Sequence, residues 1–140
     1  MTAISSRKPI ISIALDASLT QAIELMQQHG IRHLPVLDGG QLVGILSERD
    51  LTESEALEST ELNSLSVAEA MTPDPYAVPT SALLADVALT MAEQKYGCAV
   101  IVDAGGAVLD IFTTSDALRL LGEALPRLSI EQAAQRAGRV

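Results

Sequence analysis

The chain has 140 residues, of which 48% are hydrophobic and 2% aromatic, and its formal net charge at pH 7 is −9. This length fits one domain or two small repeats that share a core, and that core must be aliphatic. The negative charge argues against nucleic acid and anionic membrane surfaces as partners, because phosphate contacts need clustered lysine and arginine.

The N-terminal segment has the composition of neither a signal peptide nor a membrane helix. An apolar stretch at residues 9–15 follows Arg7 and Lys8, but Asp16 interrupts it early and no longer apolar run follows. We therefore expect no membrane span. Within this stretch, the short apolar run at residues 10–13 predicts a β-strand.

A helix with well-marked ends is predicted between Ser18 and Gly30. Ser18 and Gln21 have the spacing of a capping box, in which each side chain binds the backbone N–H of the other residue. Apolar residues follow at helical spacing, at Leu19, Ala22, Ile23 and Met26. Glycine is the residue type that most often ends a helix, so Gly30 marks its C-terminus.

A hairpin and a second helix are predicted next. The apolar runs at residues 34–37 and 42–46 flank residues 38–40, which read DGG, and this pattern is typical of a β-hairpin. Ser47 then occupies the start of a helix. The acidic stretch that follows, residues 53–70, predicts a helix or loop with a solvated charged face.

The second half of the chain repeats this order of elements. A shift of 65 residues places Met26 on Met91 and, with one extra residue in the second turn, Asp50 on Asp116. The predicted elements are a strand at residues 76–78, a helix at 84–94, strands at 100–102 and 108–112 around the glycines at 105–106, a helix from Thr113, and a helical tail at 129–137. Two strand–helix–strand–strand–helix copies predict a mixed α/β fold with a pseudo-twofold axis, whose two sheets pack against each other to bury their apolar faces.

Three motifs in these copies resemble those of CBS (cystathionine-β-synthase-type) domains. Residues 43–51 read VGILSERDL, similar to the family's closing motif, an apolar strand with Gly, then Ser or Thr, two residues, Asp and an apolar residue. Residues 33–36 (HLPV) resemble the middle strand, and residues 71–73 (MTP) resemble the opening of a repeat. The resemblance covers about residues 6 to 122. We therefore expect a tandem CBS pair, with the first repeat and its acidic connecting helix at residues 1–60, the second repeat at 61–125 and the helical tail at 126–140.

The resemblance implies a regulatory module. Paired CBS domains commonly bind AMP, ADP, ATP or S-adenosylmethionine in clefts between the repeats and often form flat dimers. The resemblance therefore implies an adenosine ligand, a homodimer and a separate effector protein, with no required cofactor and no enzyme activity. The residues agree with this function, since the two oxygens of Asp50 suit the hydroxyls of a ribose, Ser47 lies at a helix start where phosphate can bind, and Arg49 can neutralise a phosphate. The candidate ligand-binding residues are Ser47, Arg49, Asp50, His33, Pro35, Thr72, Ala77, Val78, Val100, Thr113 and Asp116.

The two copies each depart from the family's pattern at one place. Gly44 of the first copy corresponds to Asp110 in the second, where a carboxylate would repel a phosphate. The opening Thr72 of the second copy has no counterpart in the first, where residues 7–9 read RKP. We favour Asp116 slightly as the ligand-binding aspartate, because Thr72 and Thr113 both match the family in that copy, although Asp110 weakens this choice.

A structural interpretation competes with each functional one. Ser47 with Asp50, and Thr113 with Asp116, have the spacing of N-terminal helix caps. If capping is their only role, the chain is a ligand-free dimerisation or scaffold module whose apolar helix faces serve self-association.

Neither a metal site nor a catalytic set is expected. His29 and His33 lie four residues apart, but Gly30 ends the helix between them, so they would not share a face. Cys98 is the single cysteine and lies beside an apolar strand, which predicts a small buried side chain, no internal disulfide and a reducing, cytoplasmic compartment. The chain also lacks the glycine-rich phosphate loop, the C-x-x-C and H-E-x-x-H motifs, and a Ser–His–Asp set.

Overall fold

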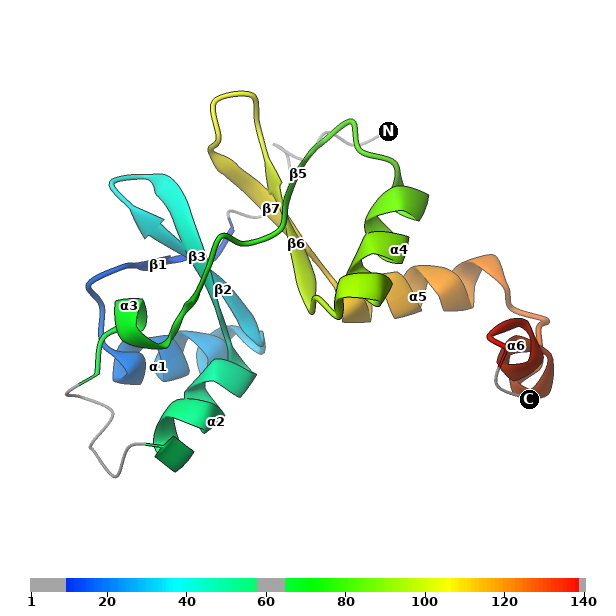
Figure 1. Cartoon of the computed structure of the whole chain (residues 1–140), viewed down its shortest axis with the longest axis horizontal. Coiled ribbons are helices and arrows are strands. Elements are labelled where there is room, and N and C mark those ends of the chain that lie inside the picture. The colour runs from blue at the N-terminus through cyan, green and yellow to red at the C-terminus, as the bar shows by residue number, and fades with distance from the viewer. Residues whose placement is uncertain (1–9, 58–64, 139–140) are drawn as a thin grey trace.

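The computed structural model of the chain describes residues 10–57 and 65–138. In chain order its elements are β1 (Ile13–Ala14), α1 (Leu19–His29), β2 (His33–Asp38), β3 (Gln41–Ser47), α2 (Glu48–Leu57), α3 (Val67–Ala70), β4 (Thr72–Pro73), β5 (Ala77–Pro79), α4 (Leu84–Gln94), β6 (Cys98–Val102), β7 (Val108–Thr113), α5 (Thr114–Ala124) and α6 (Ile130–Arg136). Two units lie side by side, with α1, α2 and α3 gathered around the first and α4 and α5 beside the second (Figure 1).

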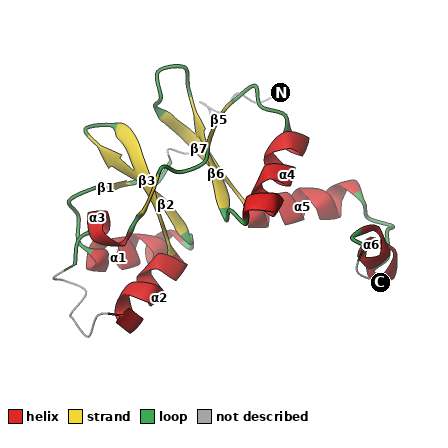
Figure 2. Cartoon of the chain, viewed as in Figure 1, coloured by secondary structure: helices red, strands yellow, loops and turns green. Residues whose placement is uncertain are grey.

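Each unit is built around a small mixed sheet, and the two sheets lie next to each other between the groups of helices (Figure 2). The strand order is β1-β2-β3-β4 in the first sheet and β5-β6-β7 in the second. In both sheets the first strand is parallel to the second, and the second is antiparallel to the third. The mixed α/β fold and the repeated order of elements are therefore confirmed.

The predicted helix ends are found where the side-chain chemistry places them. The hydroxyl of Ser18 accepts a hydrogen bond from the N–H of Gln21, and the side chain of Gln21 accepts one from the N–H of Ser18. Gly30 ends α1 in the left-handed conformation, with φ 62° and ψ 39°. Ser129 caps the short tail helix α6 in the same way that Ser18 caps α1.

The sequence interpretation was wrong about some of the shorter elements. The strand expected at residues 10–13 is β1, which covers only Ile13–Ala14. Helix α3 lies at the end of the stretch 53–70, for which a helix or loop was expected, but its bounds were not predicted. Strand β4 was not predicted, because an element of two residues is too short to show a hydrophobic period. Of the acidic stretch, α2 extends to Leu57, while residues 58–64 lie outside the described part of the chain.

The two repeats bury their apolar residues to different extents. The first core contains the fully buried Leu19, Leu34, Val36, Leu46 and Val67. The second is smaller and contains Val78, Val87, Met91 and Ala99. Among the described residues, the large hydrophobic side chains that stay exposed all belong to the second half: Leu83, Leu84, Leu89, Tyr96, Leu118, Leu120, Leu121, Leu125 and Ile130.

Corresponding turns of the two repeats approach each other across the sheets. A Cβ atom built on Gly106, in the turn between β6 and β7, would lie 3.9 Å from Oε1 of Gln41 at the start of β3. Because the second turn holds one extra residue, Gln41 corresponds to Ala107, the residue after Gly106. Close approach of corresponding turns is expected beside a twofold axis, which supports the predicted pseudo-symmetry.

Strand β4 pairs with β3 at the edge of the first sheet and leaves no room for a side chain at Gly44. Pro73 of β4 pairs with Gly44 of β3, and Thr72 pairs with Ile45. A Cβ atom on Gly44 would clash with the sulfur of Met71 and would lie 3.0 Å from the carbonyl oxygen of Thr72. The glycine at this position therefore follows from the approach of a neighbouring strand.

Replacing Gly44 by alanine tests this constraint. We expect Gly44→Ala to lower the free energy of unfolding by about 1–3 kcal/mol, because the added methyl group forces the backbone of β4 to move. Gly122 inside α5 is the control, since nothing lies within 4 Å of a Cβ built there. Gly122→Ala should raise stability by roughly 0.5–1 kcal/mol through its helix propensity. Urea denaturation measures the free energy of unfolding of both variants. If Gly44→Ala leaves that free energy unchanged, the close approach of β4 to Gly44 is contradicted.

Candidate functional site

A cavity of about 800 Å³ lies between the two repeats. The first repeat lines it with the start of β2, the end of β3 and the first two turns of α2. The second repeat contributes Thr72 of β4, the loop from Asp74 to Tyr76, and the loop from Lys95 to Cys98. This volume is within the usual range for small-molecule sites, which are often found between structural units.

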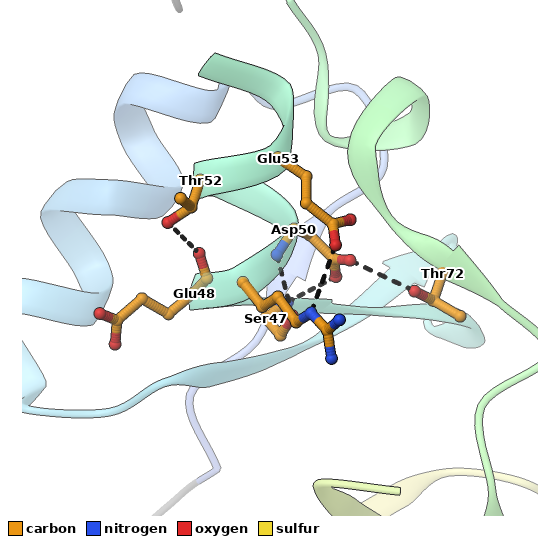
Figure 3. Close-up of polar contacts among 7 residues, drawn as sticks. Ser47, Glu48, Asp50, Thr52, Glu53 and Thr72 are labelled. Atoms are coloured by element: carbon orange, nitrogen blue, oxygen red, sulfur yellow. Dashed lines mark hydrogen bonds and ion pairs between the residues drawn. The ribbon is translucent and has the colours of Figure 1, made fainter. Parts of the chain in front are cut away.

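Asp50 of α2 lies in this cavity, and its two oxygens have different partners (Figure 3). One oxygen, Oδ2, accepts a hydrogen bond of 2.8 Å from the N–H of Ser47, and the N–H of Asp50 donates to the Ser47 hydroxyl at 3.1 Å. The other oxygen, Oδ1, accepts only a long 3.5 Å contact from the hydroxyl of Thr72. Asp50 therefore caps α2 with one oxygen and retains acceptor capacity on the other.

Asp116 occupies the equivalent place in the second repeat, as predicted. Its Oδ2 accepts from the N–H of Thr113 at 2.8 Å, and its own N–H donates to the Thr113 hydroxyl at 3.2 Å. Its Oδ1 lies 3.8 Å from the guanidinium of Arg119. Neither Thr113 nor Asp116 lines the cavity that contains Asp50.

The position of Thr72 corrects one inference from the sequence. Thr72 was grouped with Asp116 because both belong to the second repeat in chain order. The structure instead places Thr72 beside Asp50, because β4 pairs with β3 of the first repeat. Thr72, one of the two residues on which the preference for Asp116 rested, therefore supports Asp50 instead, while Thr113 stays beside Asp116.

The other candidates divide into two groups. His33, Ser47, Arg49, Asp50 and Thr72 line the cavity together. Pro35 and Val100 are fully buried in their strands, Val78 is buried in the second core, and Ala77 is exposed on β5, and none of these four lines this cavity. A ligand-binding role for them, and for Thr113 and Asp116, stays a prediction.

Sequence analysis missed an aromatic pair in the cavity. Tyr76 and Tyr96 are the chain's two tyrosines, and both line the cavity. Their ring centroids are 5.3 Å apart and their planes are tilted by 31°. The sequence did contain a signal, because aromatic residues are scarce in this chain and each tyrosine stands one or two residues before a strand.

Two non-glycine residues with positive φ also line the cavity. Asp74 has φ 52° and Lys95 has φ 60°, and no other non-glycine residue of the described chain has a positive φ. Lys95 ends α4 in the conformation that Gly30 adopts at the end of α1. This conformation costs about 1–3 kcal/mol for a residue with a Cβ atom, and such strain is concentrated at functional sites.

The arginines of the cavity are already paired with carboxylates. Nε of Arg49 lies 3.3 Å from Oε1 of Glu53, and Nε of Arg32 lies 3.8 Å from Oε2 of Glu48. The ammonium group of Lys95 has no partner within the described residues. Arg49 was predicted to meet a phosphate directly, and in this structure it would first have to leave Glu53.

Burial shifts the pKa values of His33 and Cys98, which both line the cavity. Burial lowers the pKa of His33 below its ordinary value of 6.5, and Arg32 lowers it further, while Asp50 and Glu48 oppose this change. Burial raises the pKa of the Cys98 thiol to about 11, so the thiol is protonated and unreactive at neutral pH, in agreement with its predicted structural role. His33 also packs tightly, since a Cβ on Gly97 would lie 2.7 Å from its Nε2.

Within residues 10–57 and 65–138, His, Cys, Asp and Glu side chains form no group of three that is arranged to hold a metal ion. No helix in the same residues has the length and apolar character needed to cross a membrane.

Comparison with protein families and curated sequences gives consistent matches. The family model described as "CBS domain" matches residues 3–56 and 67–123. An inosine-5'-monophosphate dehydrogenase of Korarchaeum cryptofilum is 31% identical over 109 residues, and an L-aspartate semialdehyde sulfurtransferase of Methanocaldococcus jannaschii is 29% identical over 116 residues. The matched residues are 78% and 82% of this chain but only 22% of each of those proteins. A CBS domain-containing protein of Dictyostelium discoideum is 29% identical, covering 81% of this chain and 86% of that protein.

Two similar solved structures contain adenosyl compounds. The CBS domain pair of protein MJ0100, in complex with 5'-methylthioadenosine and S-adenosyl-L-methionine, has a TM-score of 0.76 and 28% identity, covering 88% of this chain and 98% of that one. CBSX2 of Arabidopsis thaliana, in complex with AMP, has a TM-score of 0.71 and 30% identity, covering 84% and 91% of the two chains.

The lowered pKa of His33 predicts a pH dependence of stability. The folded protein favours the neutral imidazole, so below about pH 6.5 the unfolded chain binds more protons and the free energy of unfolding falls. Part of this fall should disappear in His33→Gln, measured by urea denaturation from about pH 7.5 to about pH 5. His29→Gln, at an exposed position, is the control and should keep the fall. An NMR titration that places the His33 pKa above 6.5 would contradict the prediction.

Proposed function

Because the chain belongs to the CBS-domain family and carries a tandem pair of these domains, we propose that it is a regulatory module that binds an adenosyl ligand between its repeats. The observation that carries this proposal is the cavity around Asp50, which both repeats line. Similar CBS pairs hold AMP, 5'-methylthioadenosine and S-adenosyl-L-methionine, which supports an adenosyl ligand here.

Asp50 is the residue that we assign to the ribose. The diol of a ribose donates two hydrogen bonds, and a carboxylate that accepts them must have free acceptor positions. The Oδ1 atom of Asp50 has such positions, because its one contact is the 3.5 Å hydroxyl of Thr72. The cap of α2 through Oδ2 fixes the carboxylate in place before the ligand arrives, which reduces the entropy lost on binding.

The regulatory output follows from the shared walls of the cavity. A ligand that contacts Asp50 of the first repeat and Tyr76 or Lys95 of the second binds best at one separation of the repeats. Ligand binding therefore shifts the population of molecules toward that separation. The size of the shift is set by how much more tightly the ligand binds this arrangement of the repeats than the other arrangements. A separate effector protein that contacts both repeats would detect this shift, and the chain needs no catalytic residues for that role.

Substitution of the two equivalent aspartates tests the binding site. Asp50→Asn removes the charge and one ribose acceptor but keeps an oxygen for the cap, so affinity for AMP or S-adenosylmethionine should fall about 10- to 150-fold. Asp116→Asn makes the same change to an equivalent cap outside the cavity. Isothermal titration calorimetry should therefore show that Asp116→Asn keeps the wild-type affinity of the cavity around Asp50, and both variants should lose similar, small amounts of stability.

Equal losses of affinity in both variants would contradict the assignment to Asp50. If the wild-type protein binds none of AMP, ATP and S-adenosylmethionine at millimolar concentration, the proposal of an adenosyl sensor is wrong.

A ligand-free dimerisation module is the alternative, and the exposed leucines of the second repeat favour it. Leu118 is 67% exposed and Leu121 is 53% exposed, and their spacing places them on one face of α5. A soluble monomer rarely keeps such a face uncovered. We propose a second copy of the chain as the covering surface, and a dimer of this kind is also compatible with ligand binding.

Size measurements test the dimer. Multi-angle light scattering at about 10 μM should give the mass of two chains for the wild-type protein, and the mass of one chain for the double variant Leu118→Ser, Leu121→Ser, because the interface loses its apolar contacts. Circular dichroism controls for folding of the variant. A wild-type monomer would contradict the dimer, and a dimer that binds no adenosyl ligand would favour the scaffold function.

A further inference from the structure

We propose that the cavity selects its ligand by charge and takes a cationic S-adenosyl sulfonium compound in preference to a nucleotide with several phosphates. This inference rests on the proposed adenosyl-binding function and goes further by naming the class of ligand. Two features of the cavity wall carry it: the balance of charged groups and the tyrosine pair.

The charged groups of the cavity disfavour a polyphosphate. Four carboxylates line the cavity, and they belong to Glu48, Asp50, Glu53 and Asp74. Three cationic side chains line it as well, those of Arg32, Arg49 and Lys95. Both arginines are engaged by carboxylates of the same wall, at 3.3 Å for Arg49 and 3.8 Å for Arg32. The lowered pKa of His33 keeps its imidazole neutral at pH 7, so it adds no further cation. A triphosphate would meet a wall with an excess of negative charge.

Lys95 defines how much negative charge the ligand can carry. Its ammonium is the one cationic group of the wall without a carboxylate partner in the described chain. One such group matches one small anionic group, such as the carboxylate of an amino-acid tail, better than a chain of phosphates. Asp74, a carboxylate of the wall that has no cationic partner in the described chain, matches a positive group of the same ligand.

The tyrosine pair supplies a surface that favours positive charge. The faces of aromatic rings are electron-rich and attract cations that have lost part of their water shell. Tyr76 is half-buried, Tyr96 is 41% exposed, and both line the cavity, so both keep surface that a bound ligand can reach. A sulfonium centre gains from this surface, whereas a phosphate is repelled by it.

Calorimetry with four probes at one ionic strength tests the selection. The probes are S-adenosylmethionine, its uncharged-sulfur analogue S-adenosylhomocysteine, AMP and ATP. We expect S-adenosylmethionine to bind at least about tenfold more tightly than ATP and about threefold to tenfold more tightly than S-adenosylhomocysteine, which lacks the sulfonium charge. Tyr96→Leu should abolish the difference in affinity between S-adenosylmethionine and S-adenosylhomocysteine. Tyr96→Phe keeps the aromatic ring and should preserve that difference.

A charge variant tests the carboxylates directly. Glu53→Gln with Asp74→Asn releases Arg49 from its ion pair and removes two negative charges, so the preference for S-adenosylmethionine over ATP should narrow at least about threefold. Asp16→Asn with Glu24→Gln is the matched control, because both carboxylates are exposed and neither lines the cavity. That control should leave the preference unchanged.

The outcomes separate this inference from the function on which it rests. If ATP binds as tightly as S-adenosylmethionine, or if the control changes the preference as much as the cavity variant does, charge selection is wrong and the adenosyl-binding function stands. If none of the four probes binds, both proposals are wrong.

Discussion

The pairing of β4 with β3 is the contact on which the arrangement of both repeats depends. Thr72 and Pro73 open the second repeat in sequence but extend the sheet of the first, where Gly44 leaves room for them. From this strand the chain passes directly through Asp74 to Tyr76 into β5, so the start of the second sheet is held beside the first turn of α2. The cavity owes its two-sided wall to this short connection.

The helix caps explain how equivalent aspartates can serve different purposes. Asp50 and Asp116 make the same pair of backbone hydrogen bonds, and each helix start needs them whether or not a ligand is present. The difference lies in the second oxygen, which faces Thr72 and the cavity in Asp50 but Arg119 in Asp116. The need to cap a helix therefore keeps the aspartate in the same geometry in both copies. The residues around its second oxygen determine which of the two aspartates has an acceptor free for a ligand.

The sequence predicted the parts of the fold that local chemistry determines. The capping box at Ser18, the left-handed end at Gly30 and the bounds of α4 all follow from residue type and hydrophobic spacing. The position of Thr72 could not be predicted in this way, because it depends on pairing between strands of different repeats. The tyrosine pair was missed for the same reason, since Tyr76 and Tyr96 become neighbours only after β5 and β6 align in parallel.

The placement of Tyr76 and Tyr96 also gives the protein an intrinsic optical probe. The chain has no tryptophan and one phenylalanine, so its near-ultraviolet emission comes almost entirely from two rings that lie 5.3 Å apart in one cavity. Changes in that signal report on the space between the repeats with little contribution from the rest of the molecule. Spectroscopy of the unlabelled protein can therefore follow events in this cavity selectively, an advantage that an aliphatic core confers.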